Sequence, residues 1–366
     1  MQKKIIALAI ASALTAPALA FADVTPYAQA NLSVDRVNDG NSPRSTTNQL
    51  VSNYSYIGLK GSEDMGGGLA VVGKIEGSVG MDGSSNNLGT SLGTSSNPSN
   101  SSNNQFTTTF LFNRDTYLGL SSATMGTVVA GRHETPYMMA TRKLDMFGDT
   151  VAADTRSSMG VVMMGGGHDI YVSNVVAYIS PSMSGFSVAA ASVFGAETAA
   201  TNATKGSLYS LAGMYEQGPI YAALAYDNIK AGSTGSGDLG TGTFGAVDDK
   251  ATAFKVGGSY TVDAFAINAV IERLTNTIAS TGQDLKNTDF YLAGKFNITS
   301  TDDVKLAYTK RGDTTGNTDN AKQYALGYDH AMARNTSVYA LYSKVTQNAA
   351  GASDPSTLSA GIKHSF

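Results

Sequence analysis

Apolar and polar positions alternate with a period of two along most of the chain. Val304, Leu306 and Tyr308, for example, alternate with Lys305 and Thr309. An extended strand directs successive side chains to opposite faces, so this pattern predicts strands with one apolar and one polar face. About sixteen such strands are predicted, over residues 24–37, 52–62, 69–80, 106–121, 127–133, 169–180, 186–195, 207–216, 220–230, 250–261, 265–275, 288–298, 304–311, 322–330, 336–346 and 356–366.

Short and long connections between these strands alternate. The segments SPSMSG, EQGP, TVDA, ITSTDD and HAMARN are tight, whereas the segments between them are much longer. A soluble sandwich has no reason to keep its short turns at one end, but a membrane barrel has short periplasmic turns and long external loops. The sequence therefore predicts an all-β fold, a transmembrane antiparallel β-barrel of sixteen strands.

Aromatic residues support this barrel, because they gather within a few residues of the short turns or of the C-terminus. On the lipid-facing side they would form a girdle at one membrane interface. The residues concerned are Tyr178, Phe186, Tyr215, Tyr260, Phe265, Phe296 and Phe366.

The first and last predicted strands have matching patterns. In VTPYAQANLSV, Leu32 and Val34 alternate with Asn31 and Ser33, and the final LSAGIKHSF alternates in the same way. An open sheet edge in lipid leaves backbone groups without hydrogen bonds, at several kcal/mol each. We therefore expect these two strands to pair and close the cylinder.

The segment MQKKIIALAIASALTAPALAFA has the features of a secretory signal. Lys3 and Lys4 precede an apolar run, and small residues near Ala20 suit cleavage. We expect a signal peptide over residues 1–22 and a single pore domain over 23–366. A retained membrane helix is the alternative, which Pro17 disfavours.

Charge and composition exclude several functions. Without the two signal lysines the chain has 23 basic and 29 acidic residues, a net charge of −6, which argues against a nucleic-acid partner. It has no cysteine, so no disulfide or thiol chemistry is expected. The four histidines are scattered, and we predict neither a metal nor a cofactor. No later apolar run is long enough for a membrane-spanning helix.

The motifs GLKGSEDMGGGL, FNRDTYLGL, GTVVAGR and the terminal GIKHSF resemble the general porins of Gram-negative outer membranes. The resemblance covers essentially the whole chain after the signal. It implies a homotrimeric barrel in the outer membrane whose third long loop folds into the lumen. It also implies passive diffusion of small hydrophilic solutes and ions. The C-terminal Phe366 would be part of the signal read by the outer-membrane assembly machinery.

Alternation places candidate pore residues on two neighbouring strands. If Ile57 and Leu59 face lipid, their neighbours face inward, and the same holds around Ile75. The predicted inward side chains are Tyr56, Lys60, Lys74 and Glu76. Tyr56 stands where the family often has an arginine, and Lys60 and Lys74 are the best candidates for a basic wall.

The resemblance adds Arg114 in FNRDTYLGL and Arg132 in GTVVAGR to that wall. Strict alternation from Leu118 and Leu120 would instead place Arg114 on the outside. A bulge or a subunit contact could reconcile the two, and both readings stay open.

The longest connection, residues 134–168, is the constriction loop by resemblance. Its charged residues include Glu134, Asp145, Asp149, Asp154, Arg142 and Lys143. A transverse field between loop acids and wall lysines would orient dipolar solutes. Together with the net charge of −6, these acids suggest a weak preference for cations. An exposed loop with solvated charges is the alternative.

A pore performs no chemistry, because it excludes solutes by size and selects them by charge. We therefore predict that the protein is not an enzyme. A substrate-specific channel, for sugars for example, is the main alternative, since Tyr221 and Tyr291 face inward. A barrel enzyme or adhesin is a minor one, since Ser157 and His168 share the long loop.

Overall fold

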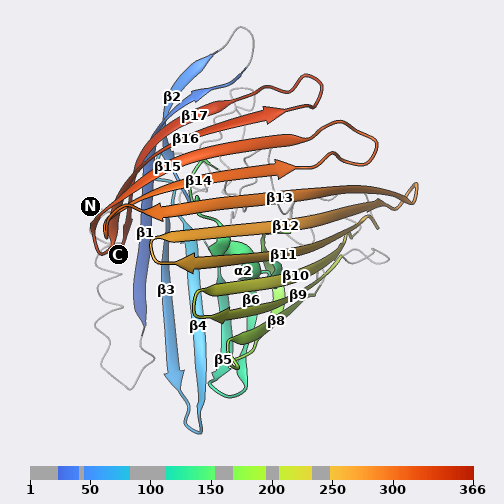
Figure 1. Cartoon of the computed structure of the whole chain (residues 1–366). Helices are drawn as coiled ribbons and strands as arrows, with labels where there is room; N and C mark the ends of the chain where they lie inside the picture. The colour runs from blue at the N-terminus through green and yellow to red at the C-terminus, as the bar shows by residue number, and fades with distance from the viewer. Residues whose placement is uncertain (1–23, 41–44, 83–111, 153–167, 195–205, 233–247) are drawn as a thin grey trace, which may run out of the picture.

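The structure, a computed structural model, describes residues 24–40, 45–82, 112–152, 168–194, 206–232 and 248–366. Within these ranges, seventeen strands form one antiparallel sheet that closes on itself (Figure 1). The strands are β1 (Thr25–Asn38), β2 (Thr46–Ser52), β3 (Tyr56–Asp64), β4 (Leu69–Ser78), β5 (Thr116–Ser122), β6 (Gly126–Glu134), β7 (Tyr171–Ile179), β8 (Phe186–Val193), β9 (Ser207–Gln217), β10 (Ile220–Lys230), β11 (Lys250–Val262), β12 (Phe265–Ile278), β13 (Gln283–Asn297), β14 (Asp302–Arg311), β15 (Ala321–Ala333), β16 (Thr336–Gln347) and β17 (Ser356–Ser365).

Strands β2 and β3 together make one crossing of the barrel wall. β1 pairs with β2 along residues 32–38 and with β3 along residues 25–29. The break between them is an irregularity at residues 53–55, where Tyr54 has a φ of 51°. The side chain of Asn53 bridges the break by donating to Ser33 Oγ over 2.8 Å. The prediction of a sixteen-stranded barrel is therefore confirmed.

The two ends of the chain close the cylinder, as predicted. β1 pairs with β17 from Gln29 opposite Ser365 to Asn38 opposite Ser356. Beyond the last pair, the backbone N–H of Phe366 donates to the carbonyl oxygen of Ala28 over 2.9 Å. Every described strand except β2, which pairs with β1 alone, thus has a hydrogen-bonded partner on both sides, as a wall in contact with lipid requires.

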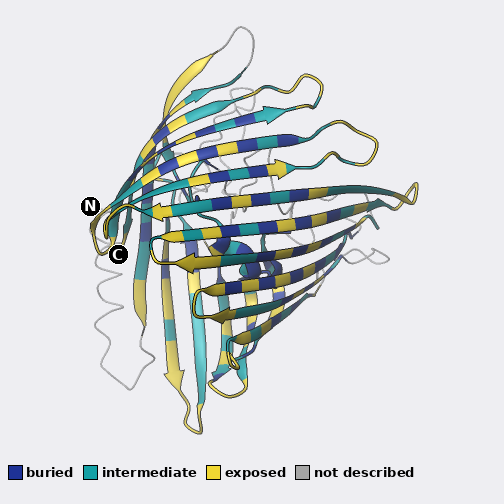
Figure 2. Ribbon diagram, in the orientation of Figure 1, coloured by how far each residue is buried: buried dark blue, intermediate teal, exposed yellow. Residues whose placement is uncertain are grey.

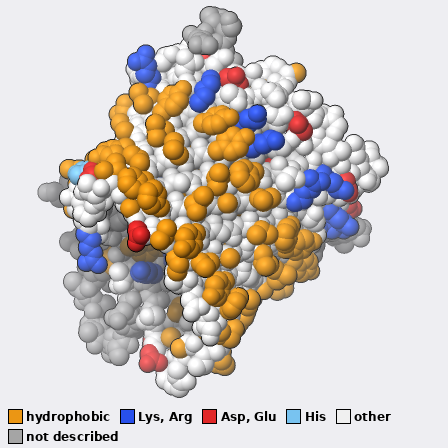
Figure 3. Space-filling view, viewed as in Figure 1, with side chains coloured by type: hydrophobic (Ala, Val, Ile, Leu, Met, Phe, Trp, Pro, Cys, Tyr) orange, Lys and Arg blue, Asp and Glu red, His pale blue; other side chains and the backbone are white. Residues whose placement is uncertain are grey.

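Exposed and buried residues alternate along the strands (Figure 2). On β10, Leu224 and Tyr226 are exposed while Ala225 and Asp227 are fully buried. The exposed side chains form a hydrophobic band on the outer wall (Figure 3). Near the short turns, Phe186 lies 4.5 Å from Tyr215 between ring centroids, as expected for the predicted girdle.

Several strands are longer than the apolar pattern predicted. β13 begins at Gln283, five residues before the predicted start at 288, and β2 extends the second crossing back to Thr46. These added residues are mostly polar on both faces. A strand that continues beyond the apolar band keeps its backbone pairing but loses the hydrophobic alternation, which is why the sequence pattern missed these ends.

The segment between β6 and β7 contains a short helix, α2 (Pro136–Thr141), followed by η2 (Arg142–Leu144). No helix among the described residues is long and apolar enough to span a membrane. Thr135 caps α2, because its Oγ1 accepts a hydrogen bond from the backbone N–H of Met138 over 3.2 Å. Pro136 occupies the first helical turn, where its missing N–H costs nothing.

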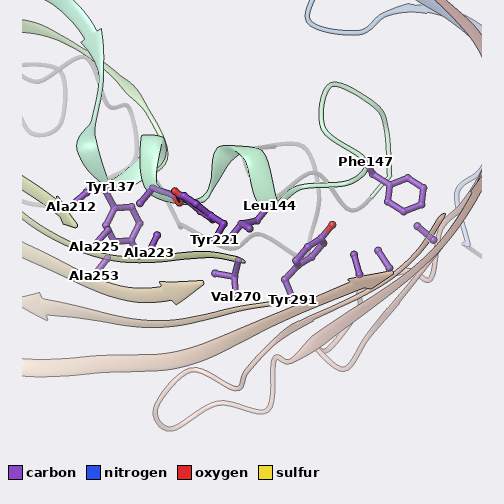
Figure 4. Close-up of a cluster of buried hydrophobic side chains, with 14 of the residues drawn as sticks. Tyr137, Leu144, Phe147, Ala212, Tyr221, Ala223, Ala225, Ala253, Val270 and Tyr291 are labelled. Carbon is purple, nitrogen blue, oxygen red and sulfur yellow. Dashed lines mark hydrogen bonds between the residues drawn. The ribbon is translucent and has the colours of Figure 1, made fainter. Parts of the chain in front are cut away.

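Side chains of this segment form the main hydrophobic core together with inward residues of the barrel wall (Figure 4). Tyr137, Leu144 and Phe147 are almost completely buried. They pack against small residues, which include Ala212, Ala223, Ala225, Ala253, Ala293, Ala307 and Ala325.

Two glycines of the wall are required for this packing. A Cβ added to Gly257 would lie 2.6 Å from Leu144 Cδ1, and one added to Gly327 would lie 2.8 Å from Phe147 Cε1. Even the smallest side chain at either position would force the facing Leu144 or Phe147 side chain to move. The sequence of β11 and β15 is therefore fitted to a loop that lies inside the barrel.

Candidate functional site

The described part of the loop between β6 and β7 reaches across the inside of the barrel. At one side, the hydroxyl of Tyr221 on β10 donates to the carbonyl oxygen of Ala140 over 2.6 Å. At the other side, Asn31 Nδ2 on β1 donates to the carbonyl oxygen of Asp149 over 2.7 Å. Lys363 on β17 also lies 3.4 Å from the Asp149 carboxylate. These contacts agree with a loop that narrows the lumen.

A buried polar cluster anchors the loop to β11 and β12. The hydroxyl of Tyr137 donates to the Glu272 carboxylate, and Lys255 Nζ lies 2.5 Å from Asp169 Oδ1. The Lys255 ammonium also lies 3.9 Å from the centre of the Tyr137 ring. All four side chains are nearly inaccessible to solvent. Breaking any of these contacts would leave a charge or a polar group buried without its partner.

Burial alters the ionisation of the two loop residues in this cluster. Burial and the neighbouring Glu272 carboxylate raise the pKa of the Tyr137 phenol well above its usual value, so it stays a hydrogen-bond donor. Burial also raises the pKa of Asp169, against the opposing effect of Lys255. Next to them, His168 Nδ1 lies 3.4 Å from Asp227 Oδ2.

The opposite wall carries basic side chains that are in contact with the lumen. Lys60 on β3 and Lys74 on β4 are direct cross-strand neighbours. Their ammonium groups lie 5.5 and 5.9 Å from the centre of the Tyr27 ring. Lys74 Nζ also lies 3.1 Å from Glu76 and 2.8 Å from Asp115. The structure thus brings three of the predicted wall residues together, with Tyr27 and Asp115 as additions.

Arg114 points inward, which decides between the two readings of the sequence. β5 begins only at Thr116, so the alternation counted back from Leu118 does not extend to residue 114. The guanidinium pairs with Glu76 and lies between the rings of Tyr56 and Tyr171, 4.6 and 5.3 Å from their centres. Arg114 is only 5% exposed, because Glu76 and the two rings enclose its side chain. It therefore stabilises the wall and does not contact passing solutes.

The other predicted charges divide between the wall and the loop. Arg132 donates from Nε to the carbonyl oxygen of Asn113 and from Nη1 to Ser173 Oγ, over 2.8 and 2.9 Å. Arg142 Nη1 lies 2.6 Å from Glu134 Oε2, so the loop neutralises one of its own acids.

Lys143 lies toward β9 and β10. It pairs with Glu216, and its ammonium group lies 3.7 Å from the centre of the Tyr221 ring. Asp154 lies outside the described residues.

A cavity of about 420 Å³ lies between the loop and β17, and it contains several of the predicted residues. Its lining consists of Met139, Arg142, Lys143, Asp145, Gly148, Asp149 and Lys363. Lys363 was not predicted, although its position on the inward face of the last strand could have indicated it. Among the described residues, no three His, Asp or Glu side chains are arranged to hold a metal ion.

The model of the Gram-negative porin family matches residues 7–350 of the chain. This chain belongs to the Gram-negative porin family. The members of this family are channels of the outer membrane and not enzymes, in agreement with the prediction from the sequence.

This porin is 26% identical to outer membrane porin protein 32 of Delftia acidovorans over 344 residues, which cover 93% of this chain and 88% of the relative. It is 24% identical to an outer membrane porin protein of Bordetella pertussis over 351 residues, which cover 86% of this chain and 83% of the relative.

Solved structures with the same fold include the anion-selective porin from Comamonas acidovorans. The TM-score is 0.77 at 20% identity, covering 94% of this chain and all of the other. The trimer form of OmpT from Vibrio cholerae has a TM-score of 0.65 at 16% identity, covering 94% of this chain and 99% of the other. These structures confirm the barrel fold, and the family match shows the outer-membrane location.

Proposed function

We propose that this porin is a homotrimeric channel for passive diffusion of small hydrophilic solutes and ions, with a weak preference for anions. The loop segment 135–152 and the facing wall form its constriction. Lys60, Lys74, Arg142 and Lys363 act on passing solutes, with Arg132 beside them, and Arg114, Glu76 and Tyr56 hold the wall in place. The OmpT trimer form of similar fold supports the trimer. The signal peptide over residues 1–22 and the part of Phe366 in assembly remain predictions.

The preference for anions rests on one observation, the unequal exposure of partners within the ion pairs at the constriction. The Lys74 side chain is 23% exposed, but its partners Glu76 and Asp115 are 3% and 7% exposed. Lys363 is 34% exposed and its partner Asp149 only 17%. In these pairs solutes meet the basic member, whereas in the Lys143–Glu216 pair the acid is the more exposed partner, at 67% against 43%. Lys60 adds an exposed charge that is not in an ion pair in the described residues.

This proposal reverses the weak cation preference suggested by the sequence. That expectation counted the loop acids and the net charge of −6 without knowing which charges face the lumen. Glu134 is paired with Arg142, and the Arg142 side chain is 33% exposed against 14% for the acid. The solved neighbour of similar fold is described as anion-selective, which supports the reversed sign.

A sugar-specific channel receives less support than it did from the sequence. The inward tyrosines that suggested it are engaged by the loop: Tyr221 donates to Ala140, and Tyr291 accepts from the backbone N–H of Met146 over 3.0 Å. Neither hydroxyl is left to guide a sugar.

The test is the zero-current potential of the purified porin in a planar bilayer under a salt gradient. We expect the zero-current potential to have the sign of anion preference. We also expect the channel to close in three steps and added sugars not to block its current. The Lys60→Ala/Lys74→Ala variant should shift the potential toward cations. Lys310→Ala/Lys322→Ala removes the same charge from the outer wall and serves as the matched control, with the wild-type potential. A cation-preferring wild type would contradict the proposed selectivity.

A further inference from the structure

One tyrosine of the inner wall lies across the strand beside it. Tyr27 on β1 is the direct cross-strand neighbour of Gly58 on β3. A Cβ added to Gly58 would lie 2.5 Å from both Cζ and Oη of Tyr27, so only a glycine leaves room for the ring. The hydroxyl reaches past Gly58 and donates to Glu76 Oε2 on β4 over 2.7 Å. The ring therefore lies over β3 with one face toward the Gly58 backbone.

The other face of the Tyr27 ring is turned to the lumen. Tyr27 occupies an inward position of β1, and part of its surface is accessible to solvent. Tyr339 on β16 lies over Gly361 in a similar way, but it is only 7% exposed and its hydroxyl donates to Asn31 Oδ1 over 3.0 Å. Tyr27 thus offers passing solutes an open aromatic surface, whereas Tyr339 is covered.

Two lysines border this aromatic surface, and only one of them has acidic partners. The ammonium groups of Lys60 and Lys74 lie 5.5 and 5.9 Å from the centre of the Tyr27 ring. Lys74 pairs with Glu76 and Asp115, but Lys60 has no ion pair in the described part of the chain. Because Lys60 and Lys74 are direct cross-strand neighbours, their like charges repel. An anion beside Lys60 would offset this repulsion.

Tyr56 provides a second aromatic surface beside Tyr27. The two ring centroids are 6.1 Å apart and the ring planes meet at 69°. The Arg114 guanidinium packs against Tyr56, 4.6 Å from its centre. A planar group stacked on Tyr27 therefore lies nearly perpendicular to Tyr56, which is the edge-to-face arrangement that aromatic rings favour.

We infer that Tyr27 and Lys60 form a weak binding site for aromatic carboxylates in the lumen. The ring of the solute stacks on Tyr27 while its carboxylate lies next to the Lys60 ammonium. Stacked rings have centroids about 4.5–7 Å apart, and Lys60 lies at a similar distance from Tyr27, so one small solute makes both contacts. A saturated carboxylate makes only the ionic contact, and a neutral sugar does not offset the charge of Lys60.

This inference rests on the proposed function as a diffusion channel and names a class of solute for it. A solute that passes through a pore must bind well enough to enter and weakly enough to leave. One stacking contact and one solvent-exposed ionic contact meet both conditions, because each is worth little in water.

The test compares benzoate with cyclohexanecarboxylate, which has the same charge and nearly the same size but no aromatic face. The full-length porin is placed in a planar bilayer in potassium chloride, and each carboxylate is added until the chloride current is halved. For the wild type we expect the half-blocking concentration of benzoate to be lower than that of cyclohexanecarboxylate by about two- to tenfold.

Three variants separate the two contacts. Tyr27→Leu removes the aromatic face and should raise the half-blocking concentration of benzoate to that of cyclohexanecarboxylate. Tyr27→Phe keeps the ring and loses only the hydroxyl, so it is the matched control and should keep the wild-type preference for benzoate. Lys60→Gln should raise both half-blocking concentrations by a similar factor, because both carboxylates lose the same ionic contact.

Equal half-blocking concentrations for the wild type, no block by either carboxylate, or an unchanged preference in Tyr27→Leu would overturn the inference. The wild-type comparison decides the matter even if Tyr27→Leu does not fold. The zero-current potential tests the proposed selectivity separately. A cation-preferring channel that benzoate still blocks more strongly than cyclohexanecarboxylate would contradict the selectivity alone and would support the aromatic site.

Discussion

Two regions of the inner wall of this porin carry charged residues at inward positions, and the alternation in the sequence does not distinguish them. On β3 and β4, Lys60 and Lys74 face the lumen and are in contact with solvent. On β11 and β12, Lys255 and Glu272 also face inward, but the loop covers them almost completely. Facing inward is therefore not the same as lining the pore, because the loop decides which part of the wall passing solutes can reach.

The two regions also differ in what their charges do. On the open side, water and ions screen the exposed charges of Lys60 and Lys74, which act on solutes, whereas the Arg114–Glu76 pair beside them is buried. On the covered side, screening is weak, and Lys255, Asp169 and Glu272 depend on one another. We expect substitutions on the covered side to affect stability, and those on the open side to affect selectivity.

The largest expected effect is that of Lys255→Met. It leaves Asp169 and Glu272 buried without a cation, which should lower the free energy of unfolding by about 3–5 kcal/mol, measured by urea titration in lipid vesicles. Lys305→Met is the control, since Lys305 lies 2.6 Å from Asp329 in a more exposed pair, and should cost about 1 kcal/mol or less. Equal losses for the two variants would show that the covered cluster is not special.

Tyr137→Phe should have the next largest effect. It removes only the hydroxyl that donates to Glu272 and should cost about 1–3 kcal/mol, because a buried carboxylate oxygen loses its donor. A looser loop should also increase current fluctuations in single-channel recordings. A variant with wild-type stability and quiet currents would remove this hydrogen bond from the anchor.

Gly257→Ala tests the fit between loop and wall. The new Cβ would displace Leu144, so we expect a loss of about 1–3 kcal/mol and an altered single-channel conductance. Gly213→Ala is the matched control on the outer face, where the nearest atom would be 3.8 Å away. If both variants kept wild-type conductance, the loop would not be held against β11.

Arg114→Met should have the smallest effect on selectivity of the wall substitutions. The guanidinium is enclosed by Tyr56 and Tyr171, so its loss should shift the zero-current potential less than Lys60→Ala/Lys74→Ala does. A shift as large as that of the double variant would mean that Arg114 acts directly on passing ions.

The sequence predicted the barrel well, because alternation, turn lengths and the matching ends are local features. It also suggested Lys60, Lys74 and the loop between β6 and β7 as the constriction, and this assignment remains a prediction. It did not reveal which charges the loop covers, since that depends on contacts between residues far apart in the chain, such as Tyr137 with Glu272.

Two features of the sequence could have indicated the covered region. Inward positions such as Ala223, Ala225 and Ala293 are small, which leaves room for a loop. The pair Thr135–Pro136 is typical of the start of a helix and marks the beginning of α2. The direction in which the Arg114 side chain points could not be predicted from the sequence. It depends on where β5 begins, because the alternation of side chains ends there.

The division of the inner wall can be tested most directly by cysteine accessibility, because the chain has no cysteine of its own. Lys60→Cys and Ala225→Cys would each be exposed in a planar bilayer to a charged, membrane-impermeant thiol reagent while the current is recorded. The cysteine at position 60 should react quickly and change the current, and the one at the fully buried position 225 should not react. Equally fast reaction at both positions would contradict the conclusion that the loop covers β8–β12.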